Sequence, residues 1–401
     1  MTESMGIAVL GSRAHFPSLE PRAYLAHAAI SPLSSPAVAA MGALQHAFAA
    51  HGSAAFADSM TVRERLRQRL ATLVGAAEAD IGFVQNTSTG LAALATSLAV
   101  QPDERIGLFS GEYPSNVSVF QQVALRSGAG VHFFEAAVFG REPERALREL
   151  EAELQRGMRL LSVSAVQFQT GLRMPLAAIG ELCRRHGTIF CVDGVQAVGA
   201  VPIDVDEAHI DALACGAHKW LMGCDGIGFI YIRPTLMEQL EPVLVGCMSH
   251  EDAVAMLSGE PELLRYDRPL LNRAQVFEGG MLSSVGSVAL DVGVQWISEL
   301  GVPNIYQHLQ RYHDAVEQEL LSRGFISCRS ADPELRSGIL SMRPPAGICA
   351  GQLVSALAER GVVCSSPDGL LRLAPHWPNH LDEVPDVAAA LDDSLAALRA
   401  V

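Results

Sequence analysis

Stretches with helical periodicity alternate with short apolar and β-branched runs from about residue 60 onward. The helical pattern covers residues 61–75, 89–100, 143–157 and 175–187. The strand pattern covers residues 105–109, 159–166, 188–193, 211–216 and 228–234. This alternation is typical of a layered α/β domain, because each helix returns the chain to the start of the next parallel strand. We therefore predict a large domain with a mostly parallel sheet between helices.

The pattern changes after about residue 285. Residues 288–301 and 304–324 have the spacing of long amphipathic helices, and short strands and a last helix over 383–400 follow them. This change predicts a smaller α+β domain at the C-terminus, 285–401, to which the first thirty residues contribute.

Composition argues against several classes of protein. The chain has 401 residues, of which 49% are apolar, so it can bury a substantial core. Its formal net charge of −15 argues against non-specific binding to nucleic acid or to anionic membrane surfaces. No apolar run approaches the roughly 20 residues of a membrane span, and the first residues lack the pattern of a secretory signal. We expect a cytoplasmic protein that binds small molecules, with no nucleic acid and no membrane as partner.

An unusual lysine lies in the apolar stretch GAHKWLMG, at Lys219. A lysine in such a place usually extends its stem along the surface and keeps its ammonium in water. Asp193, however, ends the preceding apolar strand TIFCVD, and ligands bind beyond the carboxyl ends of parallel strands. Alone, Asp193 fits a helix cap equally well. A desolvated lysine forms Schiff bases, and pyridoxal 5′-phosphate needs such a lysine and an acid at its ring nitrogen, so the pair predicts that cofactor.

A hydroxyl-rich loop precedes an apolar helix in FVQNTSTGLAALATSL. Thr87, Ser88 and Thr89 supply hydroxyls, and Gly90 allows a close approach. Free backbone N–H groups at a helix start bind phosphate, although a hydroxyl-rich start is also ordinary capping. Together with the lysine and the aspartate, this loop is a candidate for the cofactor's phosphate.

Six motifs now occur in a characteristic order: NTSTG, GEYPSN, VDGVQAVG, GAHKWLMG with GIGF, FEGG, and LRLAPHW. Over roughly residues 20 to 390 the chain resembles the class V aminotransferase family, a branch of the fold-type I pyridoxal-phosphate enzymes. That family includes cysteine desulfurases, kynureninases and isopenicillin-N-epimerase-like proteins. The resemblance implies a large cofactor-binding domain over 31–284 and an N-terminal segment, 1–30, that packs near the active site. It also implies a homodimer with the active site at the subunit interface.

The resemblance implies roles around the cofactor ring. Lys219 would form the Schiff base and move the substrate's α-proton. Asp193 would hold the pyridinium, and Gln196 would bond to the ring's phenolic oxygen. Tyr113 takes the place of an aromatic residue or histidine that stacks on the ring in the family, and Asn116 would support it.

The resemblance also implies contacts at the two ends of the site. Ser88, Thr89 and His218 would bind the phosphate, with Thr87 beside them. Gln167 resembles a polar residue near the ring's oxygen. Arg372 resembles the arginine that holds the substrate carboxylate, a task that suits its planar bidentate donor.

The N-terminal YLAHAAISP resembles a segment that lines the substrate pocket in relatives, which makes Tyr24 and His27 candidates for substrate contact. A structural role for the histidine stays equally open.

The chain departs from the family pattern at several positions. Met281 replaces a threonine whose hydroxyl reaches the neighbouring subunit's phosphate, and Ser283 or Ser284 are possible substitutes. Gly216 and Cys224 stand where serine and proline are usual. Eight cysteines without CxxC spacing favour free thiols over disulfides or a zinc site, so no metal is expected.

Several reactions of pyridoxal-phosphate enzymes begin with the same steps. We expect an enzyme that acts on a small amino acid through an external aldimine and a Cα carbanion, with transamination as the default. A lyase that breaks a carbon–sulfur bond by β-elimination and an amino-acid epimerase are alternatives. Cys364 ends an apolar run, and only seven residues separate it from Arg372, so we take it as structural rather than as a persulfide carrier. A non-catalytic cofactor-binding regulatory domain is disfavoured, because Lys219, Asp193 and Arg372 are all present.

Overall fold

The large part of the molecule is built on a mixed sheet. The computed structural model describes residues 7–253, 255 and 266–400. Within them, seven strands pair in the order β2-β8-β7-β6-β5-β3-β4. These strands are β2 (Ile81–Val84), β3 (Arg105–Phe109), β4 (Gly130–Phe134), β5 (Leu160–Ser164), β6 (Ile189–Asp193), β7 (Ala212–Gly216) and β8 (Gly228–Ile232). Only β8 runs antiparallel to its neighbours, so the predicted mostly parallel sheet is confirmed.

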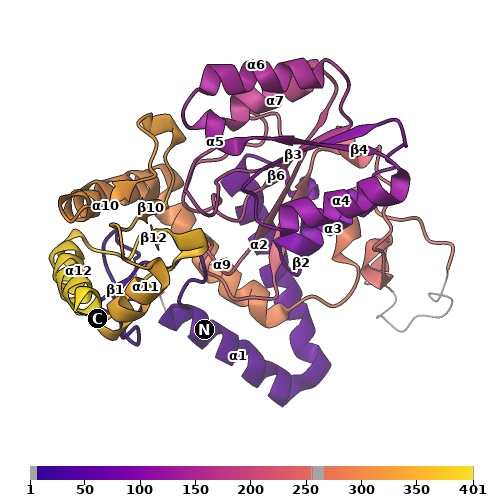
Figure 1. The fold of residues 1–401 in the computed structure, drawn as a ribbon. Helices are drawn as coiled ribbons and strands as arrows, with labels where there is room; N and C mark the ends of the chain where they lie inside the picture. The colour runs from indigo at the N-terminus through magenta and orange to yellow at the C-terminus, as the bar shows by residue number, and fades with distance from the viewer. Residues whose placement is uncertain (1–6, 254, 256–265, 401) are drawn as a thin grey trace.

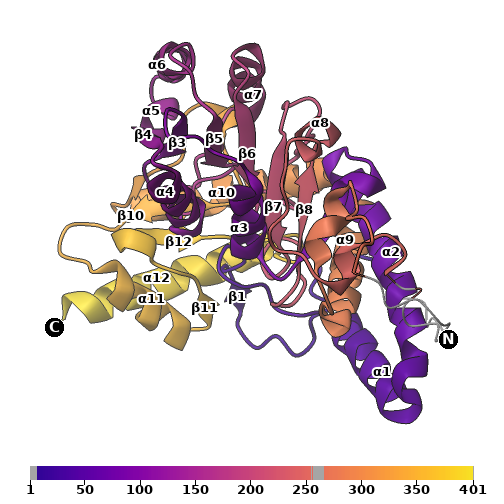
Figure 2. The same cartoon turned by 90° about the vertical axis from the view of Figure 1, so that its right-hand side faces the viewer.

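Helices cover both faces of this sheet (Figures 1 and 2). The apolar side chains of α3 (Thr87–Ser97) and α4 (Ser115–Ser127) pack with one face of the sheet. The opposite face is covered by α2 (Phe56–Val74), α6 (Pro143–Leu154), α7 (Leu176–Arg185) and α9 (Ser284–Leu300). Successive strand residues point to opposite faces, which is why Leu160 joins the first cluster and Leu161 the second.

Three further helices complete this part of the chain. The long helix α1 (Ser35–His51) packs with α2 against α9. The short helices α5 (Ala136–Phe139) and α8 (Pro234–Met237) follow β4 and β8. Because α9 contacts α1 and α2, the first helix after residue 284 lies against helices of the large part. The domain boundary at 284 and 285 stays a prediction.

A smaller unit lies beside the large sheet in Figure 1, drawn from orange to yellow. Its antiparallel sheet has the order β12-β10-β9, from β9 (Ile326–Ser327), β10 (Leu340–Arg343) and β12 (Leu371–Leu373). Its helices are α10 (Val302–Ser322), α11 (Ala350–Glu359) and α12 (Val384–Arg399). The N-terminal strand β1 (Ala23–Tyr24) pairs with β11 (Val362–Val363). Further along the same segment, the Ser31 N–H donates to the His218 carbonyl at 2.8 Å, just beyond the carboxyl end of β7.

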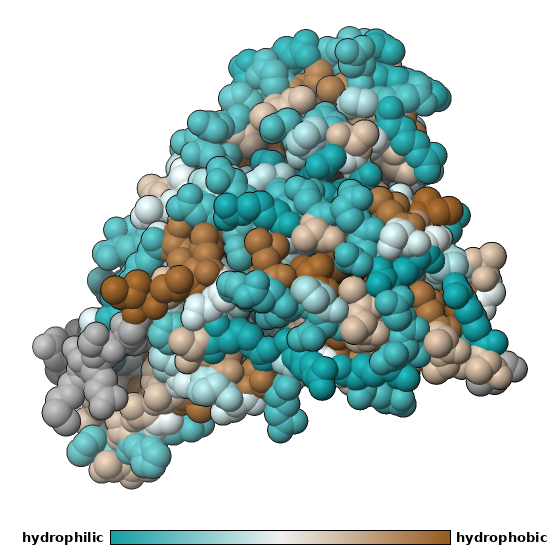
Figure 3. Space-filling view, turned by 90° about the vertical axis from the view of Figure 1, so that its left-hand side faces the viewer, coloured by the Kyte–Doolittle hydropathy of each residue, from teal (hydrophilic) through white to brown (hydrophobic). Residues whose placement is uncertain are grey.

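The surface is uneven in polarity. On the face seen in Figure 3, apolar side chains gather across the middle of the molecule, whereas the upper part, over α6 and α7, is largely hydrophilic. Among the helices in the described ranges, none combines the length and apolarity that a membrane crossing requires.

Candidate active site

A cavity of about 770 Å³ opens beyond the carboxyl ends of β6 and β7. Ligands bind at this edge of parallel sheets. Of the residues that the sequence predicts for the site, eight line the cavity: Thr87, Ser88, Tyr113, Asp193, Gln196, His218, Lys219 and Arg372. Five others do not line it: Tyr24, His27, Thr89, Asn116 and Gln167.

Lys219 lies three residues beyond the end of β7. Burial lowers the pKa of its ammonium; the charge of Asp193 opposes this shift, and that of Arg372 adds to it. The backbone is held in place, because the Ser31 hydroxyl donates a 2.6 Å hydrogen bond to the Lys219 carbonyl oxygen. Lys219 is also the single lysine in the 401 residues, since every other Lys or Arg position holds arginine. A partly desolvated amine of this kind is suited to act as a nucleophile or base.

Asp193 ends β6 and is 2% exposed. Burial raises the pKa of its carboxyl to about 7; the Val195 N–H, 2.9 Å from Oδ1, opposes this, Glu112 adds to it, and Lys219 opposes it. Within the described part of the chain, no cation forms an ion pair with Asp193. A buried carboxylate without a counter-ion is unfavourable, so a cationic group bound beside it would be strongly held.

Two residues shape the space between these charges. The ring of Tyr113 faces Lys219, whose Nζ lies 5.7 Å from the ring centroid. Its other contact is an edge-on packing against Phe168. The Gln196 amide donates to the Ala28 carbonyl at 3.0 Å and accepts from the Trp220 indole at 2.9 Å. The Tyr113 face therefore offers a platform for a planar ring, while Gln196 keeps one N–H free of these two bonds.

The polar end of the cavity is formed by the start of α3. The Ser88 hydroxyl donates to the Ser115 hydroxyl at 2.7 Å. The Thr87 hydroxyl accepts the Gly216 N–H at 2.9 Å, which ties α3 to the end of β7. Thr89 bonds instead to the side chain of Asn86, the residue that caps the helix. All three hydroxyls thus have partners within the chain, and Thr87, Ser88 and Ser115 line the cavity at this end.

Gly216 stands where the family pattern has serine, and the packing gives a reason. A Cβ atom at Gly216 would lie 3.3 Å from His218 Nδ1 and 3.3 Å from Thr87 Oγ1. Such contacts are tight, so glycine leaves room for both polar side chains at this end. Burial lowers the pKa of His218, the charge of Lys219 adds to that shift, and Asp225 opposes it.

Arg372 reaches the cavity from β12. Its guanidinium donates to the Phe168 carbonyl at 2.7 Å and to the Ser365 hydroxyl at 2.9 Å. It is 6% exposed, and burial lowers its pKa to about 10. No carboxylate of the described residues forms an ion pair with it. This arrangement leaves a fixed cation available for an anionic group in the cavity.

Asn116 and Gln167 lie behind the cavity wall, in contact with a carboxylate that the sequence reasoning did not assign. Both amides donate to Glu112, at 3.1 Å and 3.0 Å respectively. Glu112 stands beside Tyr113 in the motif GEYPSN, but its donors come from segments that are distant in the sequence.

Tyr24 and His27 also lie behind the wall, which Ala28, Ala29 and Ile30 form on this side. Tyr24 donates its hydroxyl to the Ile30 carbonyl at 2.6 Å. His27 is 2% exposed and shares a 2.7 Å hydrogen bond with Ser31, whose hydroxyl supports Lys219. Substrate contact by Tyr24 and His27 stays a prediction.

The departures from the family pattern occupy distinct places. Met281 is 71% exposed. Ser283 caps α9 and Ser284 bonds to Ser59, so both hydroxyls have partners within the chain. Cys364 is 7% exposed, and burial raises the pKa of its thiol to about 12. A thiol so buried stays protonated and is a poor nucleophile.

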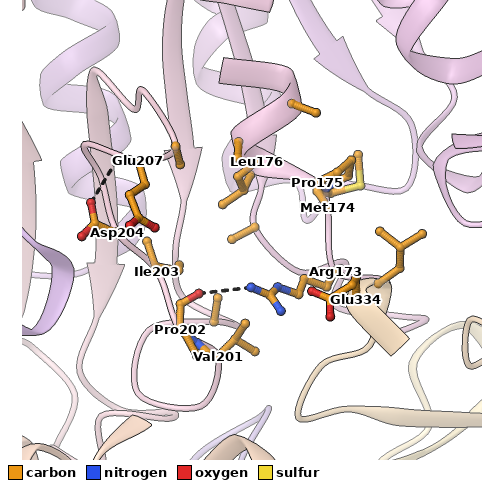
Figure 4. Close-up of a pocket in the computed structure, with 16 residues that line it drawn as sticks. Arg173, Met174, Pro175, Leu176, Val201, Pro202, Ile203, Asp204, Glu207 and Glu334 are labelled. Carbon is orange, nitrogen blue, oxygen red and sulfur yellow. Dashed lines mark hydrogen bonds between the residues drawn. The ribbon is translucent and has the colours of Figure 1, made fainter. Parts of the chain in front are cut away.

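A second cavity, of about 360 Å³, lies near the start of α7 (Figure 4). Arg173 points into it and donates to the Pro202 carbonyl at 3.4 Å. Its other charged residues are carboxylates: Asp204, Glu207 and Glu334. None of the predicted site residues lines this cavity.

The donor set of the larger cavity fits pyridoxal 5′-phosphate. A lysine amine faces an aromatic ring, a buried carboxylate has no ion pair with any described residue, and hydroxyls with a histidine line the polar end. These groups match the aldehyde, the ring nitrogen and the phosphate of the cofactor. Arg372 remains available for a further anionic group.

Comparison with known proteins gives a consistent result. A family model described as Aminotransferase class-V matches residues 23–371. A probable cysteine desulfurase of Pyrococcus abyssi is 27% identical over 84% of this chain and 84% of its own. Isopenicillin N epimerase of Streptomyces clavuligerus is 28% identical over 81% of this chain and 83% of its own.

Solved structures of the cystine C–S lyase C-DES share the fold. Two of them give TM-scores of 0.84 and 0.86 at 23% identity, over 94% and 95% of this chain and 99% of theirs. One holds glycine covalently linked to its pyridoxal-phosphate cofactor. The predicted fold-type I arrangement is confirmed.

Proposed function

The chain belongs to the class V aminotransferase family, whose cofactor is pyridoxal 5′-phosphate, and we propose that it catalyses transamination of a small α-amino acid. One observation carries the proposal. Lys219, Asp193 and Arg372 line one cavity, and none of them forms an ion pair with a described residue. Unpaired buried charges are unfavourable in a resting protein, so their convergence supports a site shaped for charged ligands.

We propose the following cofactor contacts. Lys219 bonds to the aldehyde, Asp193 holds the ring nitrogen and Tyr113 supports the ring. Ser88 and His218 bind the phosphate. When bound, pyridoxal 5′-phosphate supplies an electron sink that stabilises negative charge at the substrate Cα.

The chain's own groups then bind the substrate and move its proton. Arg372 binds the substrate carboxylate through donors that the Phe168 carbonyl and Ser365 hydroxyl hold in orientation. This anchor directs the substrate Cα toward Lys219. Because burial lowers its pKa, the Lys219 amine can be neutral and accept the Cα proton. Asp193 would hold the ring nitrogen in its protonated form by accepting its N–H.

Transamination requires fewer catalytic groups in this site than epimerisation does. It needs one base on one side of the substrate, and Lys219 supplies that base. Epimerisation needs a second proton donor across from the lysine, and Tyr113, whose ring faces Lys219, is a candidate for that donor. Tyr113→Phe would therefore leave a transaminase largely active and disable an epimerase.

Carbon–sulfur bond cleavage is the second candidate, and the desulfurase relative favours it. It uses the same lysine and arginine. Persulfide formation on Cys364 is not supported, because the thiol is buried and protonated. A lyase of this kind would release its sulfur product directly from the substrate.

A spectroscopic titration tests the choice. The purified holoenzyme is mixed with a panel of amino acids, while 2-oxo acids, ammonia and sulfide are assayed in the same samples. Transamination predicts conversion of bound cofactor to its amine form, reversed by a 2-oxo acid. Ammonia or sulfide released with the spectrum restored unaided would favour the lyase, and a racemised substrate without either product would favour the epimerase.

We also propose a homodimer. Tyr113 and Ile30 line the cavity yet are 50% and 61% exposed, and Met281 is 71% exposed. A further exposed apolar run is formed by Val243, Leu244 and Val245. Large apolar side chains that stay exposed, here at the cavity and in a consecutive run, support an interface with a second copy of the chain. Light scattering that gave a monomer at micromolar concentration would contradict this assignment.

A further inference from the structure

A second buried carboxylate lies behind the candidate site, at Glu112. It is 9% exposed and follows β3, two positions after Ser110. It forms no ion pair within the described residues. Its contacts are all with neutral donors, so its negative charge is held in place by hydrogen bonds alone.

The four donors around Glu112 fill both of its oxygens. Oε1 accepts from the Ser164 N–H at 2.8 Å and from the Gln167 amide at 3.0 Å. Oε2 accepts from the Ser164 hydroxyl and from the Asn116 amide, the latter at 3.1 Å. Two donors on each oxygen occupy the acceptor sites of an ionised carboxylate and favour that form. Burial acts in the opposite direction and raises the pKa of the Glu112 carboxyl above its ordinary value, while the bonds from Ser164, Asn116 and Gln167 lower it.

The orientation of one neighbouring amide is set independently. Asn116 accepts a 2.6 Å hydrogen bond from the Ser162 hydroxyl at its carbonyl oxygen. Its NH₂ group must therefore face Glu112. Because Ser162 lies on β5, the cage joins the start of α4 to the centre of the sheet.

The cage also lies next to Asp193. Ser164 on β5 is in register with Asp193 on β6, and side chains at one register position of parallel strands point to the same face. The Ala165 N–H donates to the Asp193 carbonyl at 2.9 Å, which fixes the two strands together at this point. Glu112 and Asp193 thus approach the cavity edge from either side of Ser164, with no cation of the described residues between them.

We propose that Glu112 is a positioning residue. Its buried negative charge, held by Ser164, Asn116 and Gln167, helps Asp193 to keep the cofactor's ring nitrogen protonated. A negative charge near that position favours the protonated, cationic form of the ring nitrogen. The direction agrees with the rise that Glu112 adds to the pKa of Asp193. This inference rests on the proposed role of Asp193 in cofactor binding.

Other titratable groups also face Asp193. They are Lys219 and the thiols of Cys191 and Cys215. Burial raises the pKa of the Cys191 thiol to about 12, and burial also raises that of Cys215. Both thiols stay neutral over the range in which the enzyme is assayed. Lys219 is bonded to the cofactor in the resting holoenzyme of the proposed mechanism, so Glu112 is the nearby charge that a substitution can remove separately.

The experiment measures the protonation of the ring nitrogen itself. Holoenzyme is reconstituted with cofactor labelled with ¹⁵N at the ring, and the ¹⁵N chemical shift is followed across pH in the wild type and in Glu112→Gln. We expect the ring nitrogen of the variant to lose its proton at least about one pH unit lower than that of the wild type. An unchanged transition in Glu112→Gln overturns the proposal.

Ser164→Ala is the matched control. It removes the hydroxyl donor to Glu112 but keeps the charge and the Ser164 backbone donor. We expect the ring nitrogen in Ser164→Ala to lose its proton at the same pH as in the wild type. A shift in Ser164→Ala as large as that in Glu112→Gln would assign the effect to the cage's shape and overturn the role of charge.

A wild-type measurement covers the case in which Glu112→Gln does not fold. Infrared spectra of holoenzyme labelled with ¹³C-glutamate report whether a buried glutamic acid is protonated at pH 7. A protonated carbonyl band that moves in Ser164→Ala would show a neutral Glu112 and overturn the proposal. An unprotonated ring nitrogen in the wild type would instead refute the proposed role of Asp193, so the two failures are distinguishable.

Discussion

Two cavities of the described structure, the one beyond the carboxyl ends of β6 and β7 and the one near the start of α7, differ in how they hold charge. Each contains an arginine that forms no ion pair with the described residues, Arg372 in one and Arg173 in the other. Arg372 is 6% exposed and is fixed by a carbonyl and a hydroxyl. Arg173 is half-buried and lies over the ring of Tyr306, 5.7 Å from its centroid. A hollow alone does not mark a functional site, whereas a deeply buried charge without a counter-charge does.

The carboxylates of the two cavities sharpen the contrast. Asp204, at the smaller cavity, caps the turn that follows it by accepting the N–H groups of Asp206 and Glu207. Asp193, at the larger cavity, is 2% exposed and accepts one backbone N–H. The first carboxylate has a local structural role. The carboxylate of Asp193 is buried, and a cation bound beside it would stabilise its ionised form.

Of the substitutions that test this comparison, removal of the lysine amine is expected to lower turnover the most. In Lys219→Ala no lysine remains in the chain, so neither the covalent cofactor link nor the proposed base can be replaced. We expect turnover to fall by roughly 10³-fold or more. Borohydride reduction followed by peptide mass spectrometry would find cofactor on the 219 peptide of the wild type and none on the variant. Turnover at the wild-type rate in Lys219→Ala would refute the mechanism.

Neutralisation of the Arg372 charge is expected to have the second-largest effect on activity. Arg372→Gln removes the charge that binds the substrate carboxylate, and a hydrogen bond to a charged group contributes about 1.5–3 kcal/mol. We therefore expect kcat/KM to fall roughly 10- to 100-fold, mainly through KM. An amine substrate without a carboxylate is the control, since its kcat/KM should not change. Equal losses for both substrates would place Arg372 in a structural role.

The main features of the fold and half of the site follow from local patterns. Lys219 and Asp193 each follow an apolar strand, and parallel strands bring their carboxyl ends to one edge. The mostly parallel sheet follows from the same alternation. The helices α1 and α4 and the strands β2 and β4 are absent from the predicted elements. Weak periodicity explains the omission of α1, whereas α4 is more strongly amphipathic than α2 and α3, so its signal was present and was not used.

The remaining site features depend on contacts between distant segments. Glu112 acquires its role from donors on β5, on α4 and at Gln167, which no local pattern reveals. Ala28 to Ile30 line the cavity in place of Tyr24 and His27, in a segment that the pairing of β1 with the distant strand β11 anchors. One strong signal was present in the sequence and was not used: Lys219 is the only lysine.

The pH dependence of apoprotein stability tests the unpaired state of Asp193. Its folded pKa is raised to about 7 from an ordinary value of 3.8, so the folded state binds the extra proton in this range. Its contribution to stability is therefore full below pH 4 and is lost as pH rises toward 7, with a limiting slope of about 1.4 kcal/mol per unit.

The difference in unfolding free energy between the wild type and Asp193→Asn isolates the pH-dependent contribution of Asp193. Buried His313 and His376, whose pKa values burial lowers to about 3 and about 4, give the opposite slope in both proteins and cancel in the difference. Urea denaturation between pH 4 and 7 should show the wild-type apoprotein losing stability relative to Asp193→Asn. Bound cofactor should remove most of that loss. A pH-independent difference would indicate that Asp193 already has a counter-charge.

Substitution of Arg173 is expected to have the smallest effect, and it decides whether the smaller cavity takes part in catalysis. Arg173→Ala removes the bond to the Pro202 carbonyl and the contact with Tyr306, both in a partly exposed setting. We expect the free energy of unfolding to fall by about 0.5–1 kcal/mol and kcat/KM to stay within about twofold of the wild type. The variant has lost an arginine that, like Arg372, has no ion pair in the described part of the chain, so it is matched in charge to Arg372→Gln. A loss of kcat/KM comparable to that of Arg372→Gln would mean that unpaired charge marks function even where it is exposed, and the distinction drawn between the two cavities would fail.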